Sequence, residues 1–221
     1  MRVVVAGRSI AWLLTCLLLG ETGAQTPHTH GHGFTGAEQW AKVFDDPARD
    51  SWQRPDEVIQ ALALAPDAVV ADIGAGTGYF ATRIAHMTPG GRVYAVDVEP
   101  DMIKYLSERA QRENLPNVTP LLAKADDPML PVAVNLALVV DTYHHIRGRK
   151  AYFRRLKDHL KLAGRVAIID FTKDSPIGPP ARERLAADDV KKEMAQAGYA
   201  LAAEHGFLPN QYFLIFRPRR P

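Results

Sequence analysis

The sequence predicts an α/β protein with a doubly wound, mostly parallel sheet, and three observations support this fold class. Residues 69–73 are a β-branched apolar run without alternation, which is typical of a strand buried on both faces. The run breaks at once into glycines at alternate positions, Gly74, Gly76 and Gly78. A helical pattern follows, and then a second apolar run that ends at Asp97. Strand, glycine turn, helix and strand in this order form a crossover unit of a parallel sheet.

The glycine turn is suited to a nucleoside that carries an amino acid. Dinucleotide-binding proteins use the spacing G-x-G-x-x-G to place a helix N-terminus against a pyrophosphate. Here the spacing is G-x-G-x-G, and Asp72 stands two residues before its first glycine. A carboxylate so close would repel a phosphate but attract an ammonium group, and Asp97, about twenty residues further on, is spaced to reach ribose hydroxyls. A tight turn packed on a helix is the alternative for a lone glycine motif.

At these residues the sequence resembles the class I S-adenosylmethionine-dependent methyltransferases, from about residue 55 to residue 217. D-I-G-A-G-T-G resembles the family's first motif and V-Y-A-V-D-V-E-P-D-M its second. L-A-L-V-V-D-T-Y-H-H-I resembles the fourth strand with its loop, and L-K-L-A-G-R-V-A-I-I-D resembles the turn and strand that follow. The resemblance implies a Rossmann-like, doubly wound, seven-stranded sheet, mostly parallel with an antiparallel last strand, and S-adenosyl-L-methionine as cofactor.

The resemblance also implies the cofactor-binding residues. Asp97 would bind the ribose, and Val98 would lie beside the adenine. The acid that bonds the adenine amino group is less well matched, because A-K-A-D-D-P stands at this point. We place Asp126 there first, with Asp127 or no residue as alternatives. The expected cofactor-binding set is Asp72, Gly74, Gly76, Gly78, Asp97, Val98 and Asp126.

The loop after the fourth strand, Asp141 to His145, is expected to meet the substrate beside the glycine turn. A neutral imidazole can take a proton from an attacking oxygen or nitrogen near neutral pH. We therefore predict His144 as the base and Asp141 as its orienting residue or a substrate contact. Tyr143 and His145 are expected to form pocket wall. Displacement at a sulfonium methyl depends on alignment and on exclusion of water, so no metal ligands are predicted for the reaction.

The N-terminus predicts export. Residues 1–24 contain two arginines, an apolar stretch I-A-W-L-L-T-C-L-L-L-G, and a final T-G-A, which is typical of a signal peptide cleaved near Ala24. We expect an exported, periplasmic protein, with a membrane tether through an uncleaved segment as the alternative. The single cysteine, Cys16, lies in this segment, so a processed chain would have no disulfide and no thiolate nucleophile or metal ligand.

Residues 25–54 are predicted to be a leader followed by a lid segment. His28, His30 and His32 alternate and could share a metal, but no nearby acid or thiolate completes a coordination shell, so a flexible leader is favoured. Two helical segments are expected between residues 35 and 64. Their aromatic side chains either line a lid over the cofactor or pack against the edge of the sheet.

Residues 55–217 are predicted to form the methyltransferase domain, with a short basic tail at 218–221. Residues 147–161 are strongly basic on one face of a helical pattern. Nucleic acid is not the favoured partner, because neither aromatic interleaving nor a second basic stretch in the domain supports it. The proline-containing loop at 172–184 could border the substrate pocket, and residues 199–217 predict an antiparallel hairpin.

The predicted function is transfer of a methyl group to an O, N or C nucleophile of a small-molecule substrate. A small molecule is favoured because the chain has no appended recognition domain, and membrane contact is expected only through the N-terminal segment. Export raises the question of cofactor supply, so a non-enzymatic, extracytoplasmic protein that holds a nucleoside or a metal stays open as an alternative. A nicotinamide-dependent oxidoreductase is disfavoured, because G-x-G-x-x-G and Y-x-x-x-K are both missing.

Overall fold

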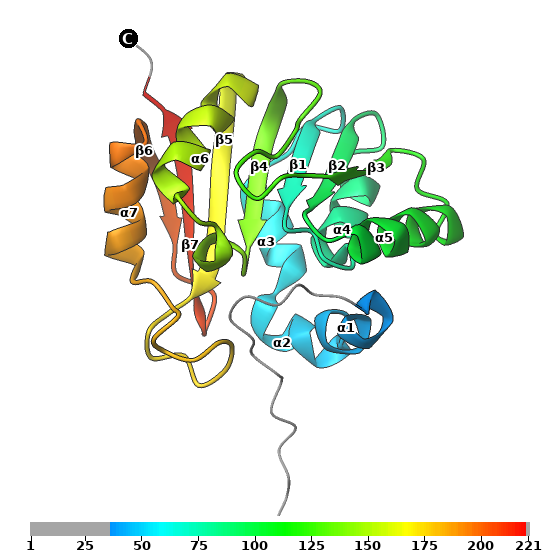
Figure 1. The fold of residues 1–221 in the computed structure, drawn as a ribbon, viewed down its shortest axis with the longest axis horizontal. Coiled ribbons are helices and arrows are strands. Elements are labelled where there is room, and N and C mark those ends of the chain that lie inside the picture. The colour runs from blue at the N-terminus through cyan, green and yellow to red at the C-terminus, as the bar shows by residue number, and fades with distance from the viewer. Residues whose placement is uncertain (1–35, 220–221) are drawn as a thin grey trace, which may run out of the picture. The chain divides into compact units, whose positions relative to one another are not determined.

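A seven-stranded sheet runs through the part of the chain that the structure, a computed structural model, describes, which is residues 36–219 (Figure 1). The strand order is β3-β2-β1-β4-β5-β7-β6. The strands are β1 (Val69–Ile73), β2 (Arg92–Asp97), β3 (Val118–Leu122), β4 (Val134–Val140), β5 (Leu160–Phe171), β6 (Tyr199–His205) and β7 (Gln211–Pro218). β1 to β5 pair in parallel, and β7 runs antiparallel to both of its neighbours. The predicted fold class is therefore confirmed.

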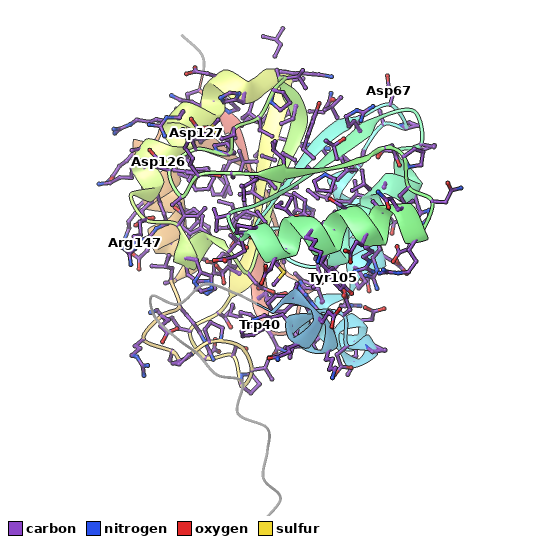
Figure 2. All side chains as sticks on the ribbon, turned by 45° about the vertical axis from the view of Figure 1, so that its right-hand side comes forward. Trp40, Asp67, Tyr105, Asp126, Asp127 and Arg147 are labelled. Atoms are coloured by element: carbon purple, nitrogen blue, oxygen red, sulfur yellow. The ribbon has the colours of Figure 1, made fainter. Side chains whose placement is uncertain are left out.

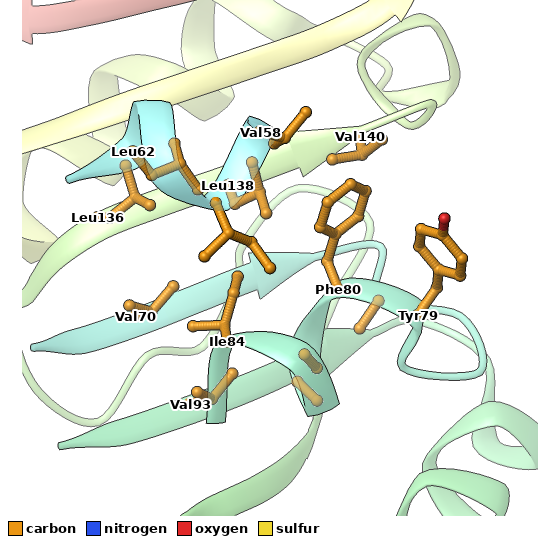
Figure 3. Packing of buried hydrophobic residues seen from close by; sticks show 14 of the residues in the cluster. Val58, Leu62, Val70, Tyr79, Phe80, Ile84, Val93, Leu136, Leu138 and Val140 are labelled. Carbon is orange, nitrogen blue, oxygen red and sulfur yellow. The ribbon is translucent and has the colours of Figure 1, made fainter. Parts of the chain in front are cut away.

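Helices cover both faces of the sheet. The helices are α1 (Ala37–Phe44), α2 (Asp50–Gln53), α3 (Pro55–Leu62), α4 (Tyr79–Met87), α5 (Pro100–Arg112), α6 (Arg149–Leu156) and α7 (Ala187–Gln196). Side chains of α3, α4 and α5 belong to one buried cluster, and those of α6 and α7 to the other. Figure 3 shows the first cluster, in which α3 and α4 pack against β1, β2 and β4. This two-sided cover places the ligand edge at the carboxyl ends of the parallel strands.

The sequence of β4 is apolar without alternation because the strand is buried on both faces. Leu136 and Leu138 belong to the cluster under α3 to α5, whereas Ala137 and Val139 belong to the cluster under α6 and α7. All four side chains are completely buried. A central parallel strand must present apolar groups to both faces, and burial of each large aliphatic side chain contributes about 1.5–3 kcal/mol. The same reasoning applies to β1, which lies beside β4 and ends in the glycine turn.

Two local features differ from the sequence prediction. The N-terminal region forms three helices rather than two, because a short 3-10 turn at Pro47–Arg49 leads into α2 before α3 begins. The start of L-K-L-A-G-R-V-A-I-I-D, expected as a turn, already belongs to β5, which begins at Leu160 and has a register shift against β4. The connection between β3 and β4, residues 123–133, contains no helix.

Several predictions lie outside the described residues. The signal segment 1–24, the histidines at 28, 30 and 32, and the last two residues of the basic tail fall there. Within residues 36–219 no helix combines the length and the hydrophobicity needed to cross a membrane. The same residues contain no group of three or more His, Cys, Asp or Glu side chains arranged to hold a metal ion.

Candidate active site

The glycine turn joins β1 to α4 and requires glycine for two separate reasons. Gly74, Gly76 and Gly78 have φ values of 74°, 55° and 95°, in the left-handed region that side chains disfavour. A Cβ atom on Gly74 would lie 2.3 Å from Oγ1 of Thr142 in the loop after β4. A Cβ atom on Gly76 would lie 3.3 Å from the ring of Phe44 at the end of α1. The turn therefore presents bare main chain between the substrate loop and the N-terminal helices.

Asp72, the last-but-one residue of β1, is 3% exposed. Burial raises its pKa to about 7, with Asp97 acting in the same direction, while Arg49 and a backbone hydrogen bond from Ala81 of α4 lower it. The carboxyl group is therefore buried beside the first turn of α4. Its predicted direct contact with an ammonium group stays a prediction.

Asp97 is the last residue of β2, and its carboxylate accepts a hydrogen bond from the glycine turn. Its Oδ2 accepts a hydrogen bond from the backbone N–H of Gly76 at 2.8 Å, and its Oδ1 accepts one from Glu99 at 3.0 Å. Burial raises the pKa of the carboxyl group, and these backbone donors oppose the shift. Each oxygen has a second lone pair, so the group can still receive a hydroxyl. Val98 follows with 49% exposure, an apolar side chain open beside the predicted ribose acid.

Asp126 lies in the β3–β4 connection, where its side chain is 75% exposed and pairs with Arg155 of α6 at 3.4 Å. Asp127 lies 4.0 Å from the same guanidinium. Figure 2 shows both acids beside α6 and apart from α1, which carries Trp40. The position of Asp126 lends no support to its predicted contact with adenine.

His144 is held by an acid that the sequence analysis did not select. Its Nδ1 lies 2.8 Å and 3.0 Å from the two carboxylate oxygens of Asp170, and both side chains are nearly inaccessible, at 4% and 2%. Burial lowers the pKa of His144, but the hydrogen bond and charge of Asp170, helped by Asp141 and Glu183, outweigh burial and raise it above its usual value. The residue that orients the ring is thus Asp170, near the end of β5, and the prediction of Asp141 for that role is wrong.

Asp141 belongs instead to a closed ring of four polar side chains, which we call the polar ring: Arg49, Gln53, Gln211 and Asp141. Arg49 donates to Oε1 of Gln53 at 3.1 Å and to Oδ2 of Asp141 at 3.3 Å. Gln53 Nε2 donates to Gln211 Oε1 at 2.7 Å, and Gln211 Nε2 donates to Asp141 Oδ1. The ring connects the N-terminal segment, the loop after β4 and the first residue of β7.

The polar ring is largely withdrawn from solvent. Gln53 is completely buried, Gln211 is 3% exposed, and the side chains of Arg49 and Asp141 are 13% and 22% exposed. Burial raises the pKa of Asp141 to about 7, although Arg49 lowers it. Asp141 also has a φ of 51°, an uncommon left-handed conformation for a residue with a side chain. Such conformations occur where the surrounding structure holds a functional residue in place.

Tyr143 and His145, the other two residues predicted for this loop, lie in different environments. Tyr143 is completely buried in the core under α6 and α7, where its ring stacks on Phe153 at 5.2 Å and its hydroxyl donates to Glu193 at 2.8 Å. That position does not support a role as pocket wall. His145 is exposed, and its ring centroid lies 4.1 Å from that of His144.

The N-terminal helices lie over the glycine turn. Trp40 stacks on Phe44 at 5.3 Å, and Phe44 is the residue in contact with Gly76. Arg109 of α5 pairs with Asp45 at 2.9 Å and donates to the carbonyl of Thr77 at 3.0 Å. The predicted lid segment therefore covers the glycine turn with aromatic rings and is fastened to α5.

The loop between β5 and α7, residues 172–186, is organised by one buried guanidinium. Arg184 is 7% exposed. It donates to the carbonyl oxygens of Ile177 at 3.0 Å and Pro179 at 2.6 Å, and also to that of Ser175. Gly178, with a φ of 91°, lies directly on the ring of Phe171. This loop begins two residues after Asp170, and its expected place at the border of the substrate pocket stays a prediction.

The fold and the site define a class of α/β protein in which a glycine turn, two strand-end acids and a histidine–carboxylate pair meet at one sheet edge. A family model described as a methyltransferase domain matches residues 70–164. The chain is 31% identical over 127 residues to protein-L-isoaspartate O-methyltransferase of Aeropyrum pernix, which covers 56% of this chain and 44% of that protein. It is 32% identical over 125 residues to an uncharacterized methyltransferase of Mycobacterium tuberculosis, covering 56% of this chain and 48% of the relative.

Solved structures agree with these matches. A SAM-dependent methyltransferase from Aquifex aeolicus superposes with a TM-score of 0.76 at 25% identity, over 81% of this chain and 97% of that one. Magnesium protoporphyrin IX methyltransferase from Synechocystis, solved with bound SAM, shares the fold with a TM-score of 0.63 at 17% identity, over 85% and 92% of the two chains. The chain spans about half the length of the curated relatives it matches. These findings show similarity to methyltransferase domains over residues 70–164 and support a class I S-adenosylmethionine-dependent methyltransferase.

Proposed function

We propose that the protein transfers a methyl group from S-adenosylmethionine to an O, N or C nucleophile of a small molecule. The observation that supports this most directly is the buried His144–Asp170 pair, beside a glycine turn whose main chain is bonded to Asp97. The residues fit the cofactor, because the turn has glycine at residues 74, 76 and 78 and Asp97 has lone pairs left for ribose hydroxyls. When bound, the cofactor would supply a methyl group on a sulfonium sulfur, and the sulfur would leave as a neutral thioether when the bond to the methyl group breaks.

His144 performs the proton transfer in this proposal. A neutral hydroxyl or amine that gains a methyl group must lose its proton. Asp170 accepts from Nδ1 and so fixes the tautomer in which Nε2 has a free lone pair. Nε2 takes the proton, and the carboxylate of Asp170 stabilises the imidazolium that forms. Such a base contributes about 10²–10⁴-fold to the rate.

The lid contributes by keeping water out. Phe44 against Gly76 and the polar ring next to it close the edge of the sheet from the N-terminal side. Removal of water strengthens the interaction between buried charges, such as the imidazolium and Asp170. The alignment of nucleophile and methyl group then depends on the rigidity of these contacts, which can supply about 7–11 kcal/mol of the barrier reduction.

Loss of the Asp97 carboxylate is expected to weaken cofactor binding. In Asp97→Asn, one carboxylate oxygen becomes an amide NH2 group, which can accept neither a backbone N–H nor a ribose hydroxyl. Affinity for S-adenosylhomocysteine should fall by about 30-fold or more, because hydrogen bonds to a charged group are worth about 1.5–3 kcal/mol each. Isothermal titration of the purified domain measures this change.

Asp126→Asn is the matched control, since it changes an exposed acid that pairs with α6. Its affinity should stay within about twofold of the wild type. A large loss in Asp126→Asn would assign that acid to the adenine after all. Full affinity in Asp97→Asn would remove Asp97 from the site. If neither S-adenosylmethionine nor its demethylated product bound the wild-type protein, the proposed function would be rejected.

We also propose that residues 1–24 direct export and are removed near Ala24. The proposal is supported by the basic start, the apolar stretch and the final small residues. Intact-mass measurement on protein from the periplasmic fraction should give a chain that begins at Gln25. A chain that begins at Met1 and sediments with membranes would favour the tethered alternative.

A further inference from the structure

We propose that Arg49 and Asp141 bind the amino-acid group of the cofactor, with the guanidinium on the carboxylate and the Asp141 carboxylate on the ammonium. This inference rests on the proposed function and deepens it. It assigns a zwitterion-binding pair to two residues that in the structure pair with each other, at 3.3 Å. One of them, Arg49, comes from the lid segment and had no predicted role.

The position of Arg49 follows from its contacts. Its Cζ lies 4.0 Å from the ring centroid of Tyr79, which is the first residue of α4 and follows the glycine turn directly. Its side chain also donates to the carbonyl of Phe44, the residue that touches Gly76. Its charge acts on both Asp72 and Asp141. The guanidinium therefore lies at the first residue of α4, directly after the glycine turn, and contacts Asp141.

The charges at this edge are complementary to a zwitterion. Asp72, Asp97, Asp141 and Asp170 are acids of the strand ends, and three of them are at least nine-tenths buried. A ligand with only a positive charge would pair with these acids, but it would offer no partner to the guanidinium of Arg49. A ligand with only negative charge would be repelled by them. An amino-acid group brings one charge of each sign, so each member of the pair gains a partner and no buried charge is left alone.

The geometry of the Arg49–Asp141 pair favours replacement of this contact by contacts to a ligand. The Arg49–Asp141 contact is long for a charge-assisted hydrogen bond, which normally measures about 2.7–2.9 Å. Meanwhile both residues are held from behind, Arg49 by Gln53 and Asp141 by Gln211, and the two amides bond each other. The polar ring can therefore keep both charged groups oriented while a ligand enters between them.

Other arginines near the turn are engaged elsewhere. Arg109 pairs with Asp45 at 2.9 Å and with Glu113 at 2.7 Å. Arg83 lies over Tyr79 at the same 4.0 Å as Arg49, but it pairs with Asp50 at 3.1 Å and is 30% exposed. Arg83 is thus a matched comparison, with the same aromatic contact and no bond to the strand-end loop.

The test compares two nucleosides by isothermal titration. S-adenosylhomocysteine has the amino-acid group, and 5′-methylthioadenosine keeps the adenosine and the sulfur but lacks that group. The wild type should bind the first about tenfold or more tightly than the second. Arg49→Gln and Asp141→Asn should each lower affinity for S-adenosylhomocysteine about 10- to 100-fold, with 5′-methylthioadenosine changed by less than about threefold. Arg49→Lys should retain part of the preference, and Arg83→Gln should retain all of it.

The outcomes separate this inference from the one on which it rests. If the wild type binds neither nucleoside, the proposed function fails. If Arg49→Gln weakens both nucleosides equally, or neither, the pair does not read the amino-acid group and the inference is wrong. A raised KM for a carboxylate-bearing acceptor with an unchanged nucleoside preference would assign Arg49 to the acceptor and also overturn it. Thermal melting of each variant identifies loss of affinity that comes from unfolding.

Discussion

His144→Gln is expected to lower kcat by about 10²–10⁴-fold with any acceptor that must lose a proton on methylation. Glutamine fills similar space and can still bond Asp170 through its amide, but it has no basic nitrogen. The loss should appear in kcat, while affinity for S-adenosylhomocysteine should stay within about threefold of wild type. An acceptor that is methylated equally fast by the variant would exclude His144 as the base.

The pH profile tests the partner of His144. The neutral imidazole is the active form, and Asp170 contributes to raising its pKa above the usual value, so activity should rise with pH through that raised pKa. In Asp170→Asn the charge is gone while burial still lowers the pKa. The midpoint of the profile should therefore move to lower pH, and the limiting rate should fall by about 10–100-fold as the tautomer is no longer fixed. An unmoved midpoint would show that Asp170 acts on structure alone.

Gly74→Ala is expected to be the most destabilising single substitution in the turn. The added Cβ would overlap Oγ1 of Thr142 at 2.3 Å, and the left-handed φ adds backbone strain. Overpacking costs about 1–3 kcal/mol and the backbone about 1–2 kcal/mol, so the free energy of unfolding should drop by about 2–5 kcal/mol. Denaturant titration measures the change.

Gly148→Ala is the control for the backbone contribution, because Gly148 has a φ of 62° and no atom lies within 4 Å of the added Cβ. This substitution should lower the free energy of unfolding only by the backbone strain, about 1–2 kcal/mol. Combining Gly74→Ala with Thr142→Gly should recover the steric part of the loss. Equal destabilisation by the two alanine variants would contradict the steric overlap.

The sequence allowed much of the fold to be predicted because the relevant signals are local. The run 69–73 has no alternation, and this is what a central parallel strand requires. Asp72 and Asp97 each stand at the end of such a run, so the sequence alone indicates the edge of the sheet at which they lie. The family match over residues 70–164 supports the resemblance to methyltransferases, and the bounds 55–217 stay a prediction.

The partner of His144 could not be found by proximity in sequence. Asp141 is three residues away, whereas Asp170 is separated by 26 and reaches the ring only because β5 lies beside β4. A usable signal was present, since Asp170 ends an apolar run in the same way as Asp72 and Asp97. Applying one rule to every strand end would have selected it.

The polar ring illustrates what sequence patterns do not contain. Arg49 and Gln53 are four residues apart on one side of a helical segment, but Gln211 is 158 residues from Gln53. Their association depends on the antiparallel return of β7 to β5, which places Gln211 opposite Phe171. The predicted contact of Asp126 with adenine has no support in the structure. The connection between β3 and β4 contains no helix, and it places Asp126 beside α6.

The guanidinium of Arg184 has a consequence for how acceptors would be chosen under the proposed function. Because this one side chain gathers the carbonyls of residues 175, 177 and 179, the loop after β5 has a fixed shape of its own. A ligand that binds against such a loop avoids most of the entropic cost of ordering it. Outward-facing positions of the loop can also be exchanged without refolding it. If the loop borders the substrate pocket, as expected from the sequence, single side-chain changes would alter the acceptor on a backbone that stays the same.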